Sequence, residues 1–143
     1  MSESNLGARP LPSAQPESAL YWRKLREREI WLRRCTACQH VYFYPRDICP
    51  GCFSRATEWI KSSGAATLYA FTIVHSIPVP AFKRELPYVA ALVELEGAAR
   101  IPTNLVEVEP HPGSVRIGMS LEPVFIDATD QVTLLCFRPR SSG

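Results

Sequence analysis

The second half of the chain alternates hydrophobic and polar residues with a period of two, which is typical of half-buried β-strands. In residues 66–75, ATLYAFTIVH, this alternation puts Tyr69, Phe71 and Ile73 on one face. In residues 88–96, YVAALVELE, it puts four hydrophobic side chains on one face and two glutamates on the other. We therefore expect two strands that each turn one face toward a core.

Three further strands are expected after a turn at residues 96–98. They are ARIPTNLVEV at 99–108, MSLEPVFID at 119–127 and QVTLLCF at 131–137, and the short polar loop 128–130 joins the last two. Short strands that follow one another without a long helix are typical of small all-β domains. The pattern predicts a small antiparallel barrel or sandwich.

The front of the chain has a different pattern. Residues 1–16, MSESNLGARPLPSAQP, carry few large hydrophobic side chains, and we expect a flexible arm. A helix is then expected through ALYWRKLRERE, in which Leu25 shares one apolar stripe with Tyr21 or Trp22. The N-terminal helical segment is expected to cover residues 17–34.

Residues 35–52, CTACQHVYFYPRDICPGC, hold four of the five cysteines in two Cys-x-x-Cys pairs. Each pair fits on one tight turn, and zinc prefers four ligands at the corners of a tetrahedron. Iron fits the same cage, but zinc is the metal we expect. Four thiolates leave no open position for water or substrate, so the metal is expected to be structural. The predicted ligands are Cys35, Cys38, Cys49 and Cys52.

Composition and charge narrow the classes of function. The 13 prolines disfavour a bundle of long helices, and a net charge of +2 is too small to imply a polyanionic partner. No stretch approaches the roughly 18 apolar residues that cross a bilayer, and the first residues lack the pattern of a signal peptide. We therefore expect a cytoplasmic protein, in which thiols stay reduced and bind metal more readily than they form disulfides.

Several segments occur in an order that is known from one protein family. They are YWRKLREREIWLRRCTACQHVYFYPRDICPGC, GAATLYAFTIVH, LPYVAALVELEG, TNLVEV, VRIGM and CFRP. This order resembles that of the zinc-ribbon proteins with an OB-fold domain that are associated with acyl-CoA metabolism, over about residues 18–140. The resemblance implies a mainly β fold, with an N-terminal helical segment, a rubredoxin-like zinc ribbon over 35–60 and a C-terminal five-stranded OB-fold barrel over 61–140. Residues 109–118 form a Pro/Gly connection where OB-folds often carry a helix, so the barrel is expected to be more open there.

The resemblance also implies a function. Members of the family bind thiolase-like or ketosynthase-like enzymes, partner with hot-dog-fold hydratases, or serve as the smaller subunit of an aldolase. This chain is therefore expected to be a non-catalytic, zinc-binding accessory subunit of an enzyme that acts on acyl-CoA thioesters.

The chain offers few candidates for catalysis. Cys136 lies among apolar strand residues, where a lone cysteine is usually a small buried hydrophobe. His75 and His111 lie at loops, and His40 is surplus beside four thiolates. No order of Ser, His and Asp, glycine-rich phosphate loop or pair of carboxylates stands out. The chain alone is expected not to be an enzyme.

Two kinds of contact are expected for an accessory subunit. The helix offers Trp22, Arg23 and Arg26 to a partner, and the ribbon offers three aromatic side chains at 42–44 that a small hairpin cannot bury by itself. Packing of these aromatics against the chain's own barrel is the alternative. The loop SIPVPAFKRELP could contact acyl-CoA itself, because it places an aromatic ring beside two cations that suit phosphate. Its candidate residues are Phe82, Lys83 and Arg84.

Binding of single-stranded nucleic acid is the alternative function, because zinc ribbons and OB-folds often serve it. The charges disfavour it. Residues 86–109 carry one cation, Arg100, against four glutamates. A phosphate backbone would meet repulsion on such a surface.

Overall fold

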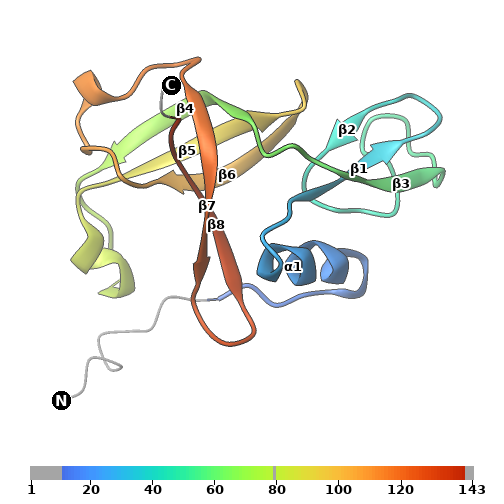
Figure 1. Ribbon diagram of the computed structural model, residues 1–143, viewed down its shortest axis with the longest axis horizontal. Coiled ribbons are helices and arrows are strands. Elements are labelled where there is room, and N and C mark those ends of the chain that lie inside the picture. Colours follow the sequence, from blue (N-terminus) through green and yellow to red (C-terminus); the bar gives the residue numbers. More distant parts are fainter. Residues whose placement is uncertain (1–10, 79, 141–143) are drawn as a thin grey trace.

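The computed structural model describes residues 11–78 and 80–140, and Arg84 by its backbone alone. Figure 1 shows a small ribbon sheet beside a larger barrel, with one helix beneath their junction. The sheet has the order β2-β1-β3, and the closed barrel has the order β4-β5-β6-β8-β7. The mainly β fold with a five-stranded barrel is thus confirmed. The elements are η2 (Pro16–Ser18), α1 (Ala19–Arg26), β1 (Trp31–Cys35), β2 (Val41–Tyr42), β3 (Thr57–Lys61), β4 (Ala66–Val74), η3 (Pro80–Glu85), β5 (Tyr88–Leu95), β6 (Ala99–Leu105), η4 (Pro112–Ser114), β7 (Ser120–Asp127) and β8 (Thr133–Pro139).

The barrel closes through one parallel and several antiparallel strand pairs. β5 pairs with β4 and with β6, and β7 pairs with β8, all antiparallel. β8 lies parallel to β6, with Leu105 opposite Phe137. β7 returns to the start of β4, where Leu121 lies opposite Ala66. The expected antiparallel arrangement therefore holds except between β6 and β8.

The alternation predicted for β5 is confirmed, but the alternation predicted for β4 is wrong at one point. In β5 every second residue from Val89 to Leu95 is buried. In β4 the register shifts between Leu68, opposite Val93, and Ala70, opposite Leu92. This β-bulge leaves Tyr69 exposed, while Leu68 before it is buried and Phe71 after it packs against the core. One extra residue moves all later side chains to the other face, which simple alternation cannot anticipate.

The barrel is not more open at the connection between β6 and β7, contrary to the expectation. The connection contains only the short helix η4. Val115, just after η4, is 5% exposed and belongs to the main hydrophobic core. Val115 thus closes the core at this connection.

The N-terminal segment differs from the expected helix over 17–34. The helix α1 ends at Arg26, and Trp31–Cys35 is strand β1 of the ribbon. Arg28 has a φ of 65°, and the N–H groups of Arg28 and Glu29 donate to the carbonyls of Leu25 and Lys24. This is the hydrogen-bond pattern of a Schellman C-cap, which ends a helix. Residues 1–10 of the expected flexible arm lie outside the described residues.

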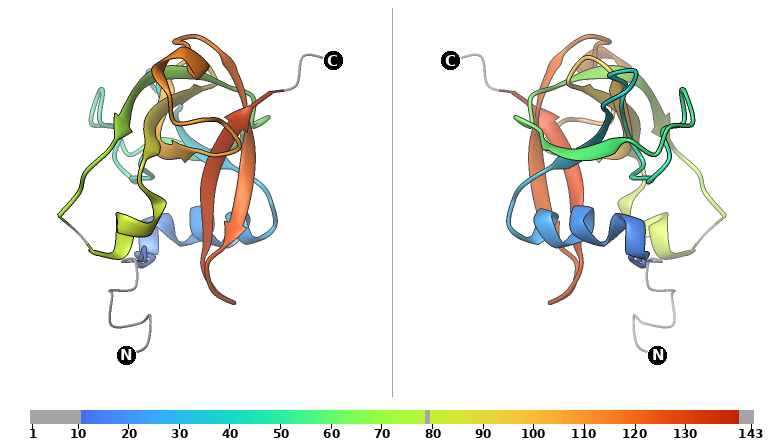
Figure 2. Two further views of the ribbon diagram at one scale, coloured as in Figure 1. Left: turned by 90° about the vertical axis from the view of Figure 1, so that its left-hand side faces the viewer. Right: turned by 90° about the vertical axis from the view of Figure 1, so that its right-hand side faces the viewer.

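Helix α1 joins the ribbon to the barrel. Its apolar stripe is formed by Tyr21 and Leu25, which are 2% and 0% exposed, and not by Trp22. Figure 2 shows α1 crossing the β7–β8 hairpin, which it contacts. The core that holds this stripe also contains Leu32 of β1 and residues of every barrel strand. The ribbon and the barrel therefore share one hydrophobic core.

We predict that Leu25→Ala lowers the free energy of unfolding by about 2–4 kcal/mol, because it removes a fully buried side chain from this shared core. Urea unfolding of the metal-loaded chain measures the change. The matched control, Arg23→Ala on the exposed face of α1, should stay within about 0.5 kcal/mol of the unchanged chain. Equal effects of the two substitutions would contradict the placement of α1.

Candidate metal centre

Two equivalent turns bring the cysteines together. The N–H of Cys35 donates to the carbonyl of His40, and the N–H of Cys49 donates in the same way to Ser54. In the reverse direction, the N–H groups of Gln39 and Phe53 donate to the carbonyls of Cys35 and Cys49. Each turn therefore begins at the first cysteine of a pair and brings the second cysteine close to it.

The four predicted ligands converge on one point. The sulfur atoms of Cys35 and Cys52 are 3.5 Å apart, and those of Cys38 and Cys49 are 3.7 Å apart. All four Sγ atoms lie within 4.8 Å of one another. Thiolates bound at about 2.3 Å to a tetrahedral zinc ion lie about 3.8 Å apart. The donor set and its spacing thus fit a four-thiolate metal ion.

The surroundings of the sulfur atoms explain why a cation suits the cluster. The backbone N–H of Cys38 points at the sulfur of Cys35 from 3.4 Å and lowers the pKa of that thiol to about 6. At Cys38 the backbone N–H of His40 also lowers the pKa, but desolvation and the neighbouring thiols outweigh it and raise the pKa to about 12. Four thiolates this close repel one another, and a divalent cation removes that penalty.

A metal ion bound by all four sulfur atoms would have no open position for chemistry. With four protein ligands, a tetrahedral ion has no site left for water or substrate. His40 lies outside the group of four sulfur atoms and stacks on Tyr42 at 5.7 Å between ring centroids. What the centre can do is hold the two turns at a fixed distance.

The histidines of the barrel serve local structure or lie exposed. His111 accepts a hydrogen bond from the N–H of Gly113 and so caps η4. His75 is exposed just after β4. Cys136 is buried in β8, as expected. Neither histidine is hydrogen-bonded to a nucleophile or a carboxylate in the described part of the chain.

The candidate contact residues form two separate groups. Arg23 and Arg26 are exposed on α1, and the indole of Trp22 donates a hydrogen bond of 2.9 Å to the hydroxyl of Tyr44. On η3, Phe82 stacks on Tyr88 at 6.3 Å, and Lys83 is exposed. The side chain of Arg84 lies outside the described residues. Figure 1 shows α1 and η3 on opposite sides of the β7–β8 hairpin, so the two groups do not form one site.

The ribbon aromatics expected to be exposed are instead packed inward. Tyr42 is 4% exposed and donates a hydrogen bond to the carbonyl of Arg46. Phe43 and Tyr44 are half-buried and meet Tyr21 edge to face. Helix α1 therefore covers the aromatic surface that we expected a partner to cover.

Sequence reasoning missed the large hydrophobic side chains that are exposed on the ribbon. Ile48 is 39% exposed and Phe53 is 77% exposed. Both flank the second cysteine pair. Their position on a tight turn beside two cysteines was a usable signal, because the small buried cluster of the ribbon cannot receive further large side chains.

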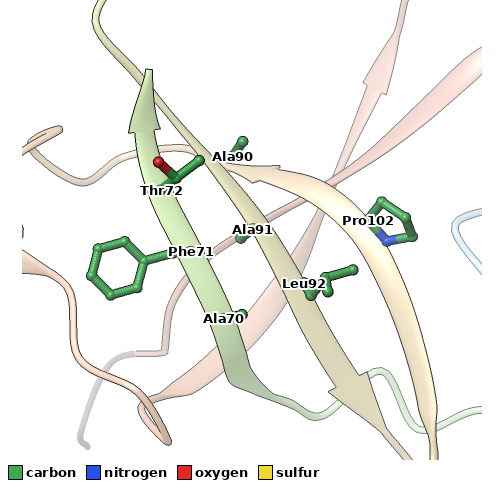
Figure 3. A pocket seen from close by; sticks show the side chains of 7 residues that line it. All are labelled: Ala70, Phe71, Thr72, Ala90, Ala91, Leu92 and Pro102. Carbon is green, nitrogen blue, oxygen red and sulfur yellow. The ribbon is translucent and has the colours of Figure 1, made fainter. Parts of the chain in front are cut away.

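Sequence reasoning also missed a shallow apolar cavity of about 300 Å³ over β4, β5 and β6. Figure 3 shows Leu92 and Pro102 beside each other, while Phe71 points away from them. The cavity depends on the small side chains of Ala70 and Ala90 on neighbouring strands. Ala70 lies opposite Leu92 and Ala90 opposite Thr72, so the two alanines share one face of the sheet. This register follows from the bulge in β4 and could not be read from the sequence.

The fold and the cysteine cluster together define the class of two-part proteins with a zinc ribbon and an OB barrel. A sequence model of the ChsH2 rubredoxin-like zinc ribbon domain matches residues 22–58, and a model of the ChsH2 C-terminal OB-fold domain matches residues 59–125. The chain belongs to this family, whose members include DUF35 domain-containing scaffold proteins.

Three relatives illustrate the family. A DUF35 domain-containing scaffold protein of Methanocaldococcus jannaschii is 43% identical over 107 residues, which cover 73% of each chain. A probable enoyl-CoA hydratase alpha subunit of Thermomonospora curvata is 34% identical over 92% of this chain, which spans only 40% of that protein. A chain of the solved Ltp2-ChsH2(DUF35) aldolase is 34% identical, with a TM-score of 0.75 over 90% of this chain and 98% of that one. In the described part of this chain, no helix has the length and apolar character to cross a membrane.

We predict about one equivalent of zinc per purified chain, and less than a tenth of that after Cys38→Ser with Cys49→Ser, because two of the four ligands are then lost. Inductively coupled plasma mass spectrometry measures the metal. Cys136→Ser is the control, since Cys136 lies in the barrel and should leave the zinc content unchanged. Loss of zinc from the control, or its retention in the double variant, would contradict the site.

Proposed function

We propose that the chain is a non-catalytic accessory subunit that binds zinc through its four clustered cysteines and docks on an enzyme acting on acyl-CoA thioesters. One observation carries the proposal. The similarity to the Ltp2-ChsH2(DUF35) aldolase extends over 98% of that chain, so the likeness includes the whole of a chain that is part of an aldolase. The hydratase alpha subunit and the scaffold protein among the relatives support the same role.

The chemistry of the chain supports a binding role. Four thiolates saturate a tetrahedral metal ion, so the metal centre stabilises structure and offers no Lewis acid. A general base needs a partner within hydrogen-bond reach. His75 and His111 have no such catalytic partner among the described residues. A cytoplasmic setting, which keeps thiols reduced, suits this role.

We place the docking surface for the enzyme on the exposed face of α1. Arg23 and Arg26 are exposed on this face, whereas the half-buried Trp22 beside them packs against the core and donates a hydrogen bond to Tyr44. Arg26 lies near enough to Asp127 to lower the pKa of that carboxyl group, but Asp127 is already bound by both terminal nitrogens of Arg28. Within the described part of the chain, the two arginines of α1 therefore remain available for acidic groups on a partner.

We predict that the chain co-purifies with a thiolase-like, hydratase or aldolase enzyme from its own cells, and that Arg23→Glu with Arg26→Glu weakens this association at least tenfold. The reversed charges would repel the acidic groups that the arginines now attract. Quantitative pull-down with mass spectrometry identifies the enzyme, and sedimentation at low and high salt measures the affinity. The control is Arg116→Glu with Arg140→Glu, which reverses two exposed charges of the barrel. A chain that recovers no such enzyme, or that hydrolyses a thioester unaided, would contradict the proposal.

We further propose that η3 contacts the CoA portion of the substrate. Phe82 and Tyr88 form a stacked aromatic pair beside the exposed Lys83. An aromatic surface suits adenine, and a cation suits the phosphates of CoA.

We predict that the isolated chain binds CoA. The double variant Lys83→Ala with Arg84→Ala should bind CoA at least fivefold more weakly, because each substitution removes a positive charge that can pair with phosphate. Isothermal titration calorimetry measures both. Arg116→Ala removes a cation elsewhere on the barrel and should leave the affinity unchanged. If the chain gives no heat with CoA, or the double variant binds as tightly as the unchanged chain, η3 is not a CoA contact.

A further inference from the structure

Phe53 is the most exposed large hydrophobic side chain in the described part of the protein. It directly follows the last cysteine of the second pair, and 77% of its surface is exposed. Its φ is 63°, in the left-handed region that an aromatic residue rarely adopts. The residue therefore combines an unfavourable backbone conformation with an unfavourable exposure of a ring.

Other non-glycine residues with positive φ use their side chains within the molecule. Arg28 binds Asp127, and Gln39 donates a hydrogen bond to the carbonyl of Thr36. Glu96 accepts hydrogen bonds from Ser62 and Ser63, and Glu107 pairs with Arg138. Each of these contacts offsets part of the backbone cost.

Phe53 has no comparable contact with the residues that the structure describes. Gln39 holds the same position in the first cysteine turn, and both positions would suit glycine. The backbone of Phe53 closes its cysteine turn through the hydrogen bond to Cys49, but glycine would do this without strain. An exposed aromatic ring at such a position therefore points to a role outside the chain.

The surface around Phe53 has the composition of an interface centre. Ile48, at 39% exposure, lies on the same turn. Residues 48–54, ICPGCFS, and residues 35–45, CTACQHVYFYP, contain no Asp, Glu, Lys or Arg. Centres of protein interfaces are depleted in charge and enriched in aromatic residues. Arg46, Asp47 and Arg55 border these segments and are exposed, which matches the polar rim that surrounds such a centre.

We propose that Phe53, flanked by Ile48, inserts into an apolar pocket on the acyl-CoA enzyme subunit. This inference rests on the proposed function and assigns the ribbon tip as a second contact with the same enzyme. A second copy of the chain does not suit the surface. Phe53 and Ile48 together expose roughly 200 Å², whereas a stable interface buries about 800 Å² on each partner. A ring that fills a pocket within a larger interface needs no such area of its own.

The placement is tested by a photoreactive p-benzoylphenylalanine at position 53, in the full chain expressed in its own cells. Illumination should crosslink this chain to the acyl-CoA enzyme subunit, identified by mass spectrometry. The control carries the same group at Ile117, which is 60% exposed on the loop between β6 and β7. In Figure 1 that loop lies on the opposite side of the barrel from the ribbon, so no crosslink to the enzyme is expected.

Several results would overturn the inference. They are crosslinks from position 53 only to a second copy or to nucleic acid, no crosslink at all, or equal crosslinking from both positions. If the unmodified chain recovers the enzyme but position 53 gives no crosslink to it, the inference alone fails. If the unmodified chain recovers no such enzyme, the proposed function fails and the inference falls with it.

We predict opposite effects of Phe53→Gly on the stability of the chain and on its affinity for the enzyme. Relief of the left-handed strain should leave the melting temperature unchanged or raise it by up to about 4 °C, while affinity falls at least tenfold. Gln39→Gly relieves the same strain in the other turn and should keep the affinity within about twofold. Calorimetry of the zinc-loaded chain and sedimentation with the enzyme measure the two quantities. A lower melting temperature for Phe53→Gly would assign the ring a structural role, and unchanged affinity would remove it from the interface.

Discussion

The position of the ribbon depends on the burial of Tyr21. Its ring is 2% exposed and lies 5.0 Å from the ring of Trp22 and 5.3 Å from that of Phe43, both edge to face. Burial raises the pKa of its hydroxyl group above the ordinary value. The ribbon contributes only a small buried cluster of its own, formed by two cysteines and Tyr42. Its orientation is therefore set by the aromatic side chains that it shares with α1 and the barrel.

The ribbon is thus held at both ends. Four thiols converge at its tip, and the aromatic cluster fixes its base. A rigid element loses little conformational freedom when a partner binds, so its contacts contribute more fully to affinity. An element that is held at both ends suits the docking role proposed above.

The sequence was informative wherever one local rule decides the structure. The spacing of the cysteines predicted their convergence, and alternation predicted the buried face of β5. Prediction from the sequence failed where one extra residue changes the strand register, and where segments far apart in the sequence pack on the same surface. The bulge at Tyr69 reverses the faces of β4, and α1 covers Phe43, which the sequence left for a partner or the barrel. The end of α1 also depends on Arg28, whose φ no propensity predicts.

The exposed surfaces differ in chemistry, and this bears on the kind of partner. The exposed face of α1 carries Arg23 and Arg26, the ribbon tip exposes Ile48 and Phe53, and the cavity over β4–β6 is lined mainly by apolar side chains. The proposed contacts on α1 and on the ribbon tip belong to parts of the chain that one shared core holds in place. A folded protein can present acidic groups to α1 and a pocket to the tip at the same time, and each contact then reinforces the other. The arrangement therefore favours a large, preformed partner surface over a flexible ligand.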